Sequence, residues 1–149
     1  MPSSVIEQVN QQLLVPAGLT ENDVEQALSI TLSGGVDYAD LYFQQSRHEN
    51  WSLEDGIVKD GGYHIEQGVG VRACSGEKTG FAYSDDLILP ALIDAAKAAR
   101  SISRQGEDKQ VQAWQRSQSP KLYSSDDPLA VLSAEQKLAL LRQADAAAR

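Results

Sequence analysis

The chain has 149 residues, 42% hydrophobic and 23% charged, which is enough apolar chain for about one globular domain. Its formal net charge of −8 at pH 7 opposes direct binding to nucleic acid or anionic lipid, because both need a surface rich in lysine and arginine. No apolar run is long enough to span a bilayer, no signal peptide is visible, and Cys74 is the single cysteine, which together favour a cytoplasmic protein.

The first part of the chain has the pattern of two helices. Ser4-x-x-Glu7 matches a capping box ahead of apolar residues at helical spacing, which predicts a helix at about residues 4–14. Thr20-x-x-Asp23 matches a second capping box and predicts a helix at about 20–33. Its expected apolar stripe is Val24, Ala27, Leu28, Thr31 and Leu32. Gly34-Gly35 then favours a stop with positive φ.

Residues 37–85 are predicted to form short β-strands joined by glycine turns. The first strand is expected at Tyr38 to Ser46, and Asp55-Gly56 predicts a tight type I′ hairpin further on. Gly61-Gly62 favours a bend or bulge. Three groups of alternating residues each define one strand face: Ala39, Leu41 and Phe43; Val69, Val71 and Ala73; and Thr79, Phe81 and Tyr83. Since such faces need burial, we expect the flanking helices to cover them.

Two further helices are expected after the sheet. One lies at about 87–104, with Asp86 as N-cap unless Pro90 moves the start later, and its buried side is Ile88, Leu92, Ala95, Ala96, Ala99 and Ile102. The polar segment Gln105–Asp127 has a predicted strand at Val111 to Gln115 and a turn near Ser119-Pro120.

The last predicted helix, at about 133–149, is capped by Ser133-x-x-Gln136. It has no stop signal, so we expect an N-terminal piece of a longer protein. The fold class is α+β, a mostly antiparallel β-meander sheet covered by helices.

The two histidines of the chain are candidate metal ligands. His48-Glu49 begins like the zinc motif H-E-x-x-H, but Ser52 stands at the second histidine position and the segment lies between two strand patterns. A histidine in a turn is the favoured interpretation. His64 and Glu66 share a strand face, but two ligands are too few for a site. Whether His48 and His64 meet across a hairpin is left open.

Other candidate chemistry is also better explained by structure. Gly68-x-Gly70-x-x-Ala73 fits the dinucleotide fingerprint in letters, but strand-like residues continue where a helix would have to start. Cys74 has no adjacent base or cation to activate its thiol. The carboxylates Glu54, Asp55, Asp60 and Glu66 fit a solvated face. We therefore assign no catalytic, cofactor-binding or metal residue.

The run DYADLYFQQSRHENWSLEDGIVKDGGYHIEQGVGVRACSGEKTGFAYSDDL, residues 37–87, closely resembles the N-terminal region of the TldD/PmbA family, and within it the TldD type. The likeness extends more loosely to both ends, including SSDDPLAVLSAEQKLALLRQAD. The family comprises intracellular metallopeptidases, also labelled modulators of DNA gyrase. The resemblance implies an N-terminal α/β domain followed by a larger catalytic C-terminal domain that holds zinc through H-E-x-x-x-H. It also implies pairing with a PmbA/TldE-like subunit around a proteolytic chamber that cleaves unfolded or small peptides.

No H-E-x-x-x-H occurs here, because Asn50 to Leu53 follow His48-Glu49. The resemblance therefore implies a non-catalytic N-terminal domain, with zinc only in the full-length parent and no enzyme activity in residues 1–149 alone. A stand-alone interaction module that pairs an exposed strand edge with a peptide or protein is the alternative. A third, weaker hypothesis is an effect on topoisomerase exerted through protein contacts. No direct nucleic-acid or membrane partner is expected.

Overall fold

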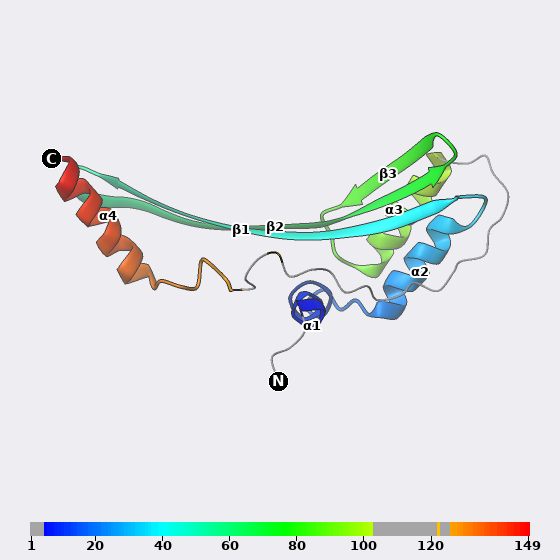
Figure 1. Cartoon of the computed structure of the whole chain (residues 1–149), viewed down its shortest axis with the longest axis horizontal. Coiled ribbons are helices and arrows are strands. Elements are labelled where there is room, and N and C mark those ends of the chain that lie inside the picture. Colours follow the sequence, from blue (N-terminus) through cyan, green and yellow to red (C-terminus); the bar gives the residue numbers. More distant parts are fainter. Residues whose placement is uncertain (1–4, 103–121, 123–125) are drawn as a thin grey trace. The chain divides into compact units, whose positions relative to one another are not determined.

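The computed structural model describes residues 5–102, 122 and 126–149 (Figure 1). The fold is α+β, with one antiparallel three-stranded sheet in the order β1-β2-β3 and helices on both sides of it in the sequence. The elements are α1 (Val5–Val9), the π-helix η1 (Asn10–Leu14), α2 (Glu21–Leu32), β1 (Tyr38–Glu54), β2 (Ile57–Ser75), β3 (Lys78–Ser84), α3 (Leu89–Ile102) and α4 (Ala134–Ala148). The chain divides into two compact units. Unit 1 comprises residues 1–45 and 66–118, and unit 2 comprises 46–65 and 119–149.

Local signals fix the boundaries of α2 in unit 1. Thr20 Oγ1 accepts a hydrogen bond from the Asp23 N–H at 3.3 Å, and the Thr20 N–H donates to Asp23 Oδ2 at 2.8 Å, so the predicted capping box is present. Gly34 and Gly35 follow the helix with φ of +80° and +89°, a conformation that glycine adopts without a Cβ clash. The first predicted helix is present as α1 and η1, while Ser4 of its capping box lies outside the described residues.

The hairpin between β1 and β2 turns where the sequence places it. Asp55 and Gly56 have φ of +51° and +76°, as a type I′ turn requires. One other prediction is wrong: β1 continues through residues 47–50, so His48 lies on a strand and not in a turn. The bend or bulge predicted at Gly61-Gly62 falls inside β2, which extends past both glycines. Pairing along the hairpin ladder outweighs the local preference of these residues for turns.

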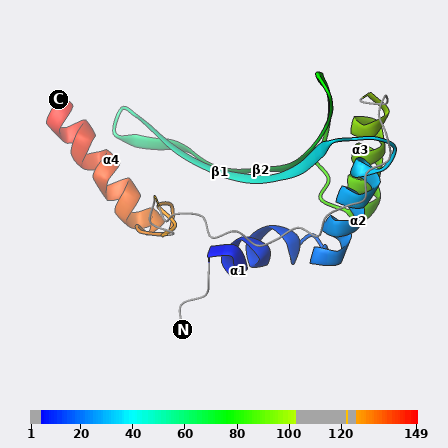
Figure 2. The same cartoon turned by 45° about the vertical axis from the view of Figure 1, so that its right-hand side comes forward.

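The core of unit 1 lies between the sheet and the helices α2 and α3, which contact each other and lie side by side in both cartoon views (Figure 2). Its buried apolar residues are Leu19, Ala27, Val36, Val69, Val71, Ala73, Leu87, Leu92, Ala95, Ala96 and Ala99. The predicted inward face of β2 is therefore confirmed. The stripe predicted on α2 is confirmed in part: Ala27 and Thr31 are buried and Leu32 packs against the core. Val24 and Leu28 are only half-buried. On β1, Ala39, Leu41 and Phe43 pack against this core as expected.

The face predicted for β3 is the opposite of the face that is buried. Phe81 and Tyr83 are exposed, and Gly80 is buried instead. A Cβ at residue 80 would collide with the carbonyl oxygen of Ala99, so α3 approaches β3 at a distance that only glycine allows. Because α3 leaves room only for small residues on β3, the side of β3 that carries Phe81 and Tyr83 points away from the core.

The start of helix α3 agrees with the predicted alternative in which Pro90 moves it to a later residue. The helix begins at Leu89 with Pro90 in its first turn, so the start is later than Asp86 would give. Ile88 and Ile102 were expected on the buried side, but their side chains are 50% and 57% exposed. The strand predicted at 111–115 and the turn near 119–120 lie outside the described residues.

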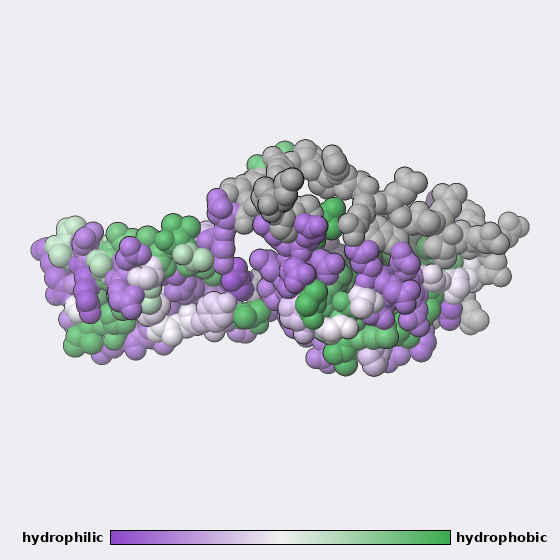
Figure 3. Space-filling model, turned by 90° about the horizontal axis from the view of Figure 1, so that it is seen from below, coloured by the Kyte–Doolittle hydropathy of each residue, from purple (hydrophilic) through white to green (hydrophobic). Residues whose placement is uncertain are grey.

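Unit 2 contains the turn end of the hairpin, residues 46–65, and helix α4. Ser133 and Gln136 form the predicted capping box of α4, with the Ser133 N–H donating to Gln136 Oε1 at 2.9 Å. None of the residues that the structure describes in unit 2 is fully buried. The space-filling view accordingly shows hydrophobic residues at the surface at its left end, where Figure 1 places α4 (Figure 3).

Candidate functional site

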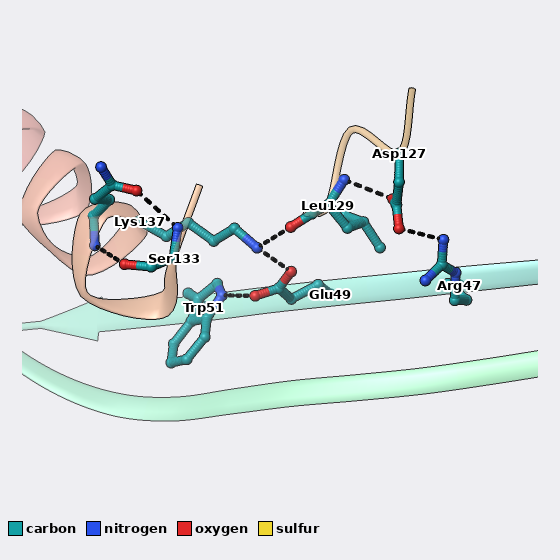
Figure 4. Close-up of polar contacts among 8 residues, drawn as sticks. Arg47, Glu49, Trp51, Asp127, Leu129, Ser133 and Lys137 are labelled. Atoms are coloured by element: carbon teal, nitrogen blue, oxygen red, sulfur yellow. Dashed lines mark hydrogen bonds and ion pairs between the residues drawn. The ribbon is translucent and has the colours of Figure 1, made fainter. Parts of the chain in front are cut away.

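Two polar contacts in unit 2 meet at the carboxylate of Glu49 (Figure 4). Its carboxylate accepts hydrogen bonds from Lys137 Nζ at 2.5 Å and from Trp51 Nε1 at 2.7 Å. Lys137 also donates to the carbonyl oxygen of Leu129 at 2.7 Å. The ammonium of Lys137, and then the indole N–H of Trp51, hold the pKa of Glu49 below its ordinary value. Glu49 is thus a structural carboxylate that ties α4 to β1.

A second ion pair lies beside the first. Arg47 Nη2 is 2.5 Å from Asp127 Oδ2, and Asp127 Oδ1 accepts from the Leu129 N–H at 3.0 Å. The guanidinium of Arg47 holds the pKa of Asp127 below its ordinary value. We call Arg47, Glu49, Trp51, Asp127 and Lys137 the Lys137 cluster. Sequence reasoning missed it, because Glu49 and Lys137 are 88 residues apart and no local pattern links them.

The candidate ligands on the hairpin do not form a metal site with one another. His48 is exposed on β1, while His64 and Glu66 are exposed on β2, and both of the latter have interactions of their own. Among the residues that the structure describes, no three His, Cys, Asp or Glu side chains lie together in a way that could hold a metal ion. The described residues therefore do not fit the zinc site that the family resemblance implies for the full-length protein.

The glycines and the cysteine lie within regular sheet. Gly68 and Gly70 are in β2, where Gly70 lies opposite Tyr83 of β3, so no helix N-terminus follows to receive a phosphate. Cys74 lies opposite Thr79, with 3.7 Å between the Cys74 Sγ and the Thr79 Oγ1. These positions support the structural interpretation of the glycines.

The carboxylates near the hairpin turn lie at the surface. Glu54, Asp55 and Asp60 are exposed, and Glu54 Oε2 is 3.9 Å from Lys59 Nζ, a distance typical of a weak surface ion pair. The solvated face predicted for them agrees with this exposure.

One open pocket of unit 1 has a lining of mixed polar and apolar surface. It lies where the segment after η1 meets the segment between β3 and α3, and its lining residues are Leu13, Pro16, Ala17, Gln67, Asp86, Leu87 and Ile88. Two polar side chains, Gln67 and Asp86, are present at its wall. This pocket resembles a surface depression more than a catalytic cleft, since such clefts combine an apolar wall with several converging polar groups.

The face of the unit 1 sheet that points away from the helices carries exposed aromatic residues. Arg72 on β2 is paired with Asp40 on β1, with 2.9 Å between Arg72 Nε and Asp40 Oδ2, and its guanidinium carbon lies 5.7 Å from the centre of the Tyr38 ring. The carboxylate of Asp40 raises the pKa of Arg72. Arg72 therefore joins β1 and β2 on this face by charge and by a cation–π contact.

Comparison with known proteins gives this domain a family. Residues 39–103 match the family model described as PmbA/TldA metallopeptidase domain 1. The chain is 42% identical over 147 residues to a protein of Haemophilus influenzae named "Metalloprotease TldD homolog", covering 97% of this chain and 30% of that protein. Two further proteins of the same name come from Buchnera aphidicola subsp. Schizaphis graminum and Buchnera aphidicola subsp. Acyrthosiphon pisum. Each is 38% identical to this chain, over 97% and 96% of its length respectively.

The fold is α+β, and the family model that residues 39–103 match describes the first domain of its family. The chain belongs to the PmbA/TldD family and corresponds to the N-terminal region of its TldD members. It spans about 30% of the length of the curated relatives it matches. In the described ranges, no helix has both the length and the apolar character that crossing a membrane demands.

Proposed function

We propose that this chain is the non-catalytic N-terminal domain of a zinc metalloprotease that cleaves unfolded or small peptides together with a PmbA/TldE-like subunit. In this proposal the zinc ion and the residues that activate water belong to the rest of the protein. The sheet and helices described here contribute to the partner interface or to the wall of the chamber in which peptides are cleaved.

The observation that carries this proposal is the match to curated TldD homologues over nearly the whole chain, at 42% identity for the Haemophilus influenzae protein. The name of those relatives gives the reaction class, and the family model assigns this part to the first domain. The proposal also includes action in the cytoplasm, and any effect on topoisomerase would act through protein contacts, given the net charge of −8.

A second candidate function is a peptide-binding module. The order β1-β2-β3 leaves β1 and β3 at the edges of the sheet. An extended peptide can add to such an edge through main-chain hydrogen bonds. Titration of the protein with extended peptides, followed by NMR, would favour this function if shifts were confined to residues of β1 or β3.

The first proposal is tested in the full-length protein with its partner subunit. The variant His48→Asn/His64→Asn should keep full zinc content and full turnover of an unfolded peptide, because neither histidine holds the metal. A metal chelator should abolish turnover in both the parent and the variant. Loss of zinc from the variant, or turnover that survives complete metal removal, would refute the proposal.

A further inference from the structure

The exposed face of the unit 1 sheet has an unusual composition. Tyr38 and Tyr42 on β1 are 52% and 64% exposed, and Phe81 and Tyr83 on β3 are 58% and 73% exposed. The solvated face of an antiparallel sheet normally carries polar side chains. Four large rings on one such face are therefore a feature to be explained, unlike single exposed apolar residues.

These rings lie on the same face. The pairing of β2 with β3 places Arg72 opposite Phe81 and Gly70 opposite Tyr83, and directly paired residues project to the same side. Arg72 contacts Tyr38 on the neighbouring strand β1, and Tyr42 follows Tyr38 at an even spacing of four residues. The opposite side of β1 packs against the core through Ala39, Leu41 and Phe43. We call Tyr38, Tyr42, Arg72, Phe81 and Tyr83 the aromatic face.

The central strand makes room for these rings and holds them in place. A Cβ at Gly70 would lie 3.0 and 3.1 Å from two ring atoms of Phe81, so the ring lies over the glycine. Arg72 fixes the Tyr38 side by its contacts with both Asp40 and the ring. Side chains with few rotatable bonds that are already positioned lose little entropy when another surface covers them.

The electrostatics of the aromatic face favour a protein surface as its occupant. The charge of Arg72 is matched by Asp40, which leaves the face close to neutral on a chain of net charge −8. A polyanion would need an excess of positive charge there. Tyrosine, phenylalanine and arginine are instead the residues enriched where proteins pack together.

We propose that the aromatic face is the docking surface for the part of the polypeptide that full-length relatives have beyond the region matched here. This part accounts for most of their length, because the matched region is about 30% of each relative. It would form a third layer on the sheet, opposite α2 and α3. The inference rests on family membership and does not depend on the proposed hydrolysis.

The first test uses the full-length protein without any substitution. Hydroxyl-radical labelling read by mass spectrometry should show Tyr42 and Tyr83 strongly protected relative to Tyr63, which is 60% exposed in unit 2 and lies outside the aromatic face. Labelling of Tyr42 and Tyr83 as fast as that of Tyr63 would overturn the proposal.

A pair of matched variants then tests the energetics. In the full-length protein Tyr83→Lys should raise the rate of proteolytic cleavage between the two parts by about tenfold, the effect of losing one well-packed aromatic anchor. Tyr63→Lys is the control and should change this rate little. If Tyr83→Lys released the PmbA/TldE-like subunit without faster cleavage, the inference would be overturned. The aromatic face would then contact that subunit and not another part of the same polypeptide. Peptide hydrolysis is measured in a separate assay, so a failure of the proposed function can be distinguished from a failure of this docking inference.

Discussion

Different kinds of interaction stabilise the interior of each of the two units of this chain. In unit 1, α2, α3 and the sheet enclose a core to which eleven buried apolar residues of the described ranges belong. In unit 2, no described residue is fully buried, and the Lys137 cluster joins α4 and the preceding segment to the hairpin. Apolar burial contributes roughly 25 cal/mol per Å². The side chains of Lys137 and Glu49 are only 19% and 14% exposed, so the cost of removing them from water offsets much of their attraction. Unit 1 should therefore dominate the stability of the chain.

The comparison also shows what each kind of contact specifies. The core of unit 1 requires small residues at fixed places, such as Gly80 under α3. The Lys137 cluster requires donors and acceptors at fixed positions but little close packing. A two-stranded hairpin alone is marginal in water, so unit 2 relies on the contacts that α4 makes with it. Unit 2 should therefore respond to pH and salt, and unit 1 chiefly to changes of side-chain volume.

The largest effect is expected from a cavity in unit 1. Leu92 is 0% exposed, and Leu92→Ala should lower the free energy of unfolding by about 3 kcal/mol through lost burial and a residual cavity. Leu140→Ala in unit 2 is the control, since Leu140 is 53% exposed. Urea unfolding followed by circular dichroism measures both. Equal losses for the two variants would contradict the contrast between the units.

A smaller loss is expected from overpacking between β3 and α3. Gly80→Ala places a methyl group against the Ala99 carbonyl oxygen and should lower the free energy of unfolding by about 2 kcal/mol, because backbone has to move. Gly70→Ala is the matched control on β2, where the added methyl meets only the exposed Phe81 ring. Thermal unfolding of both variants gives the difference, and a more harmful change at Gly70 would count against the close helix–strand approach.

The helix caps allow a finer comparison. Thr20→Ala should cost about 1 kcal/mol of unfolding free energy, because α2 is capped by Thr20 and packs on the core of unit 1. Ser133→Ala should leave that unfolding transition unchanged and speed amide exchange only in the first turn of α4. Hydrogen exchange read by mass spectrometry distinguishes the two. A shift of the main transition by Ser133→Ala would show that the units unfold together.

The smallest effect is the pH response of unit 2. Glu49 and Asp127 have pKa values lowered from the ordinary 4.5 and 3.8, so their contribution to stability is present above those values. It is lost as pH falls from there through the pKa of each folded carboxyl group. Trp51 fluorescence reports this loss in a Trp114→Phe background, where Trp51 is the single indole.

Lys137→Met serves as the control for that titration. It removes the first cause of the low pKa of Glu49, so the acid-induced change in Trp51 fluorescence should become weaker. Hydrogen-exchange protection of α2 and α3 in unit 1 should stay constant over the same range. An unchanged Trp51 titration in Lys137→Met would show that the Glu49–Lys137 pair contributes nothing to the pH response.

Much of the fold follows from short-range sequence signals. The capping boxes at Thr20 and Ser133, the stop at Gly34-Gly35 and the hairpin turn at Asp55-Gly56 each depend on a few neighbouring residues, and each is present. The family was recognised from residues 37–87, a region that the family model also covers.

The remaining features depend on contacts that are distant in sequence. Alternation in β3 shows two faces but not which one is buried, and α3 decides this by its close approach to Gly80. Residues 47–50 have no strong strand pattern, yet they are held in β1 by the hairpin ladder and by the contacts of Glu49 with α4. No window of the sequence shows that Lys137 would meet Glu49.

The uninterrupted course of β1 limits how this protein can change in length. Arg47, Glu49 and Trp51 project to one side because they are alternate residues of a strand. A single-codon deletion just before them would turn all three away from Asp127 and Lys137, whereas a two-codon deletion would restore their side. Insertions and deletions that survive during evolution in the part of β1 just before Arg47 should therefore come in pairs of residues.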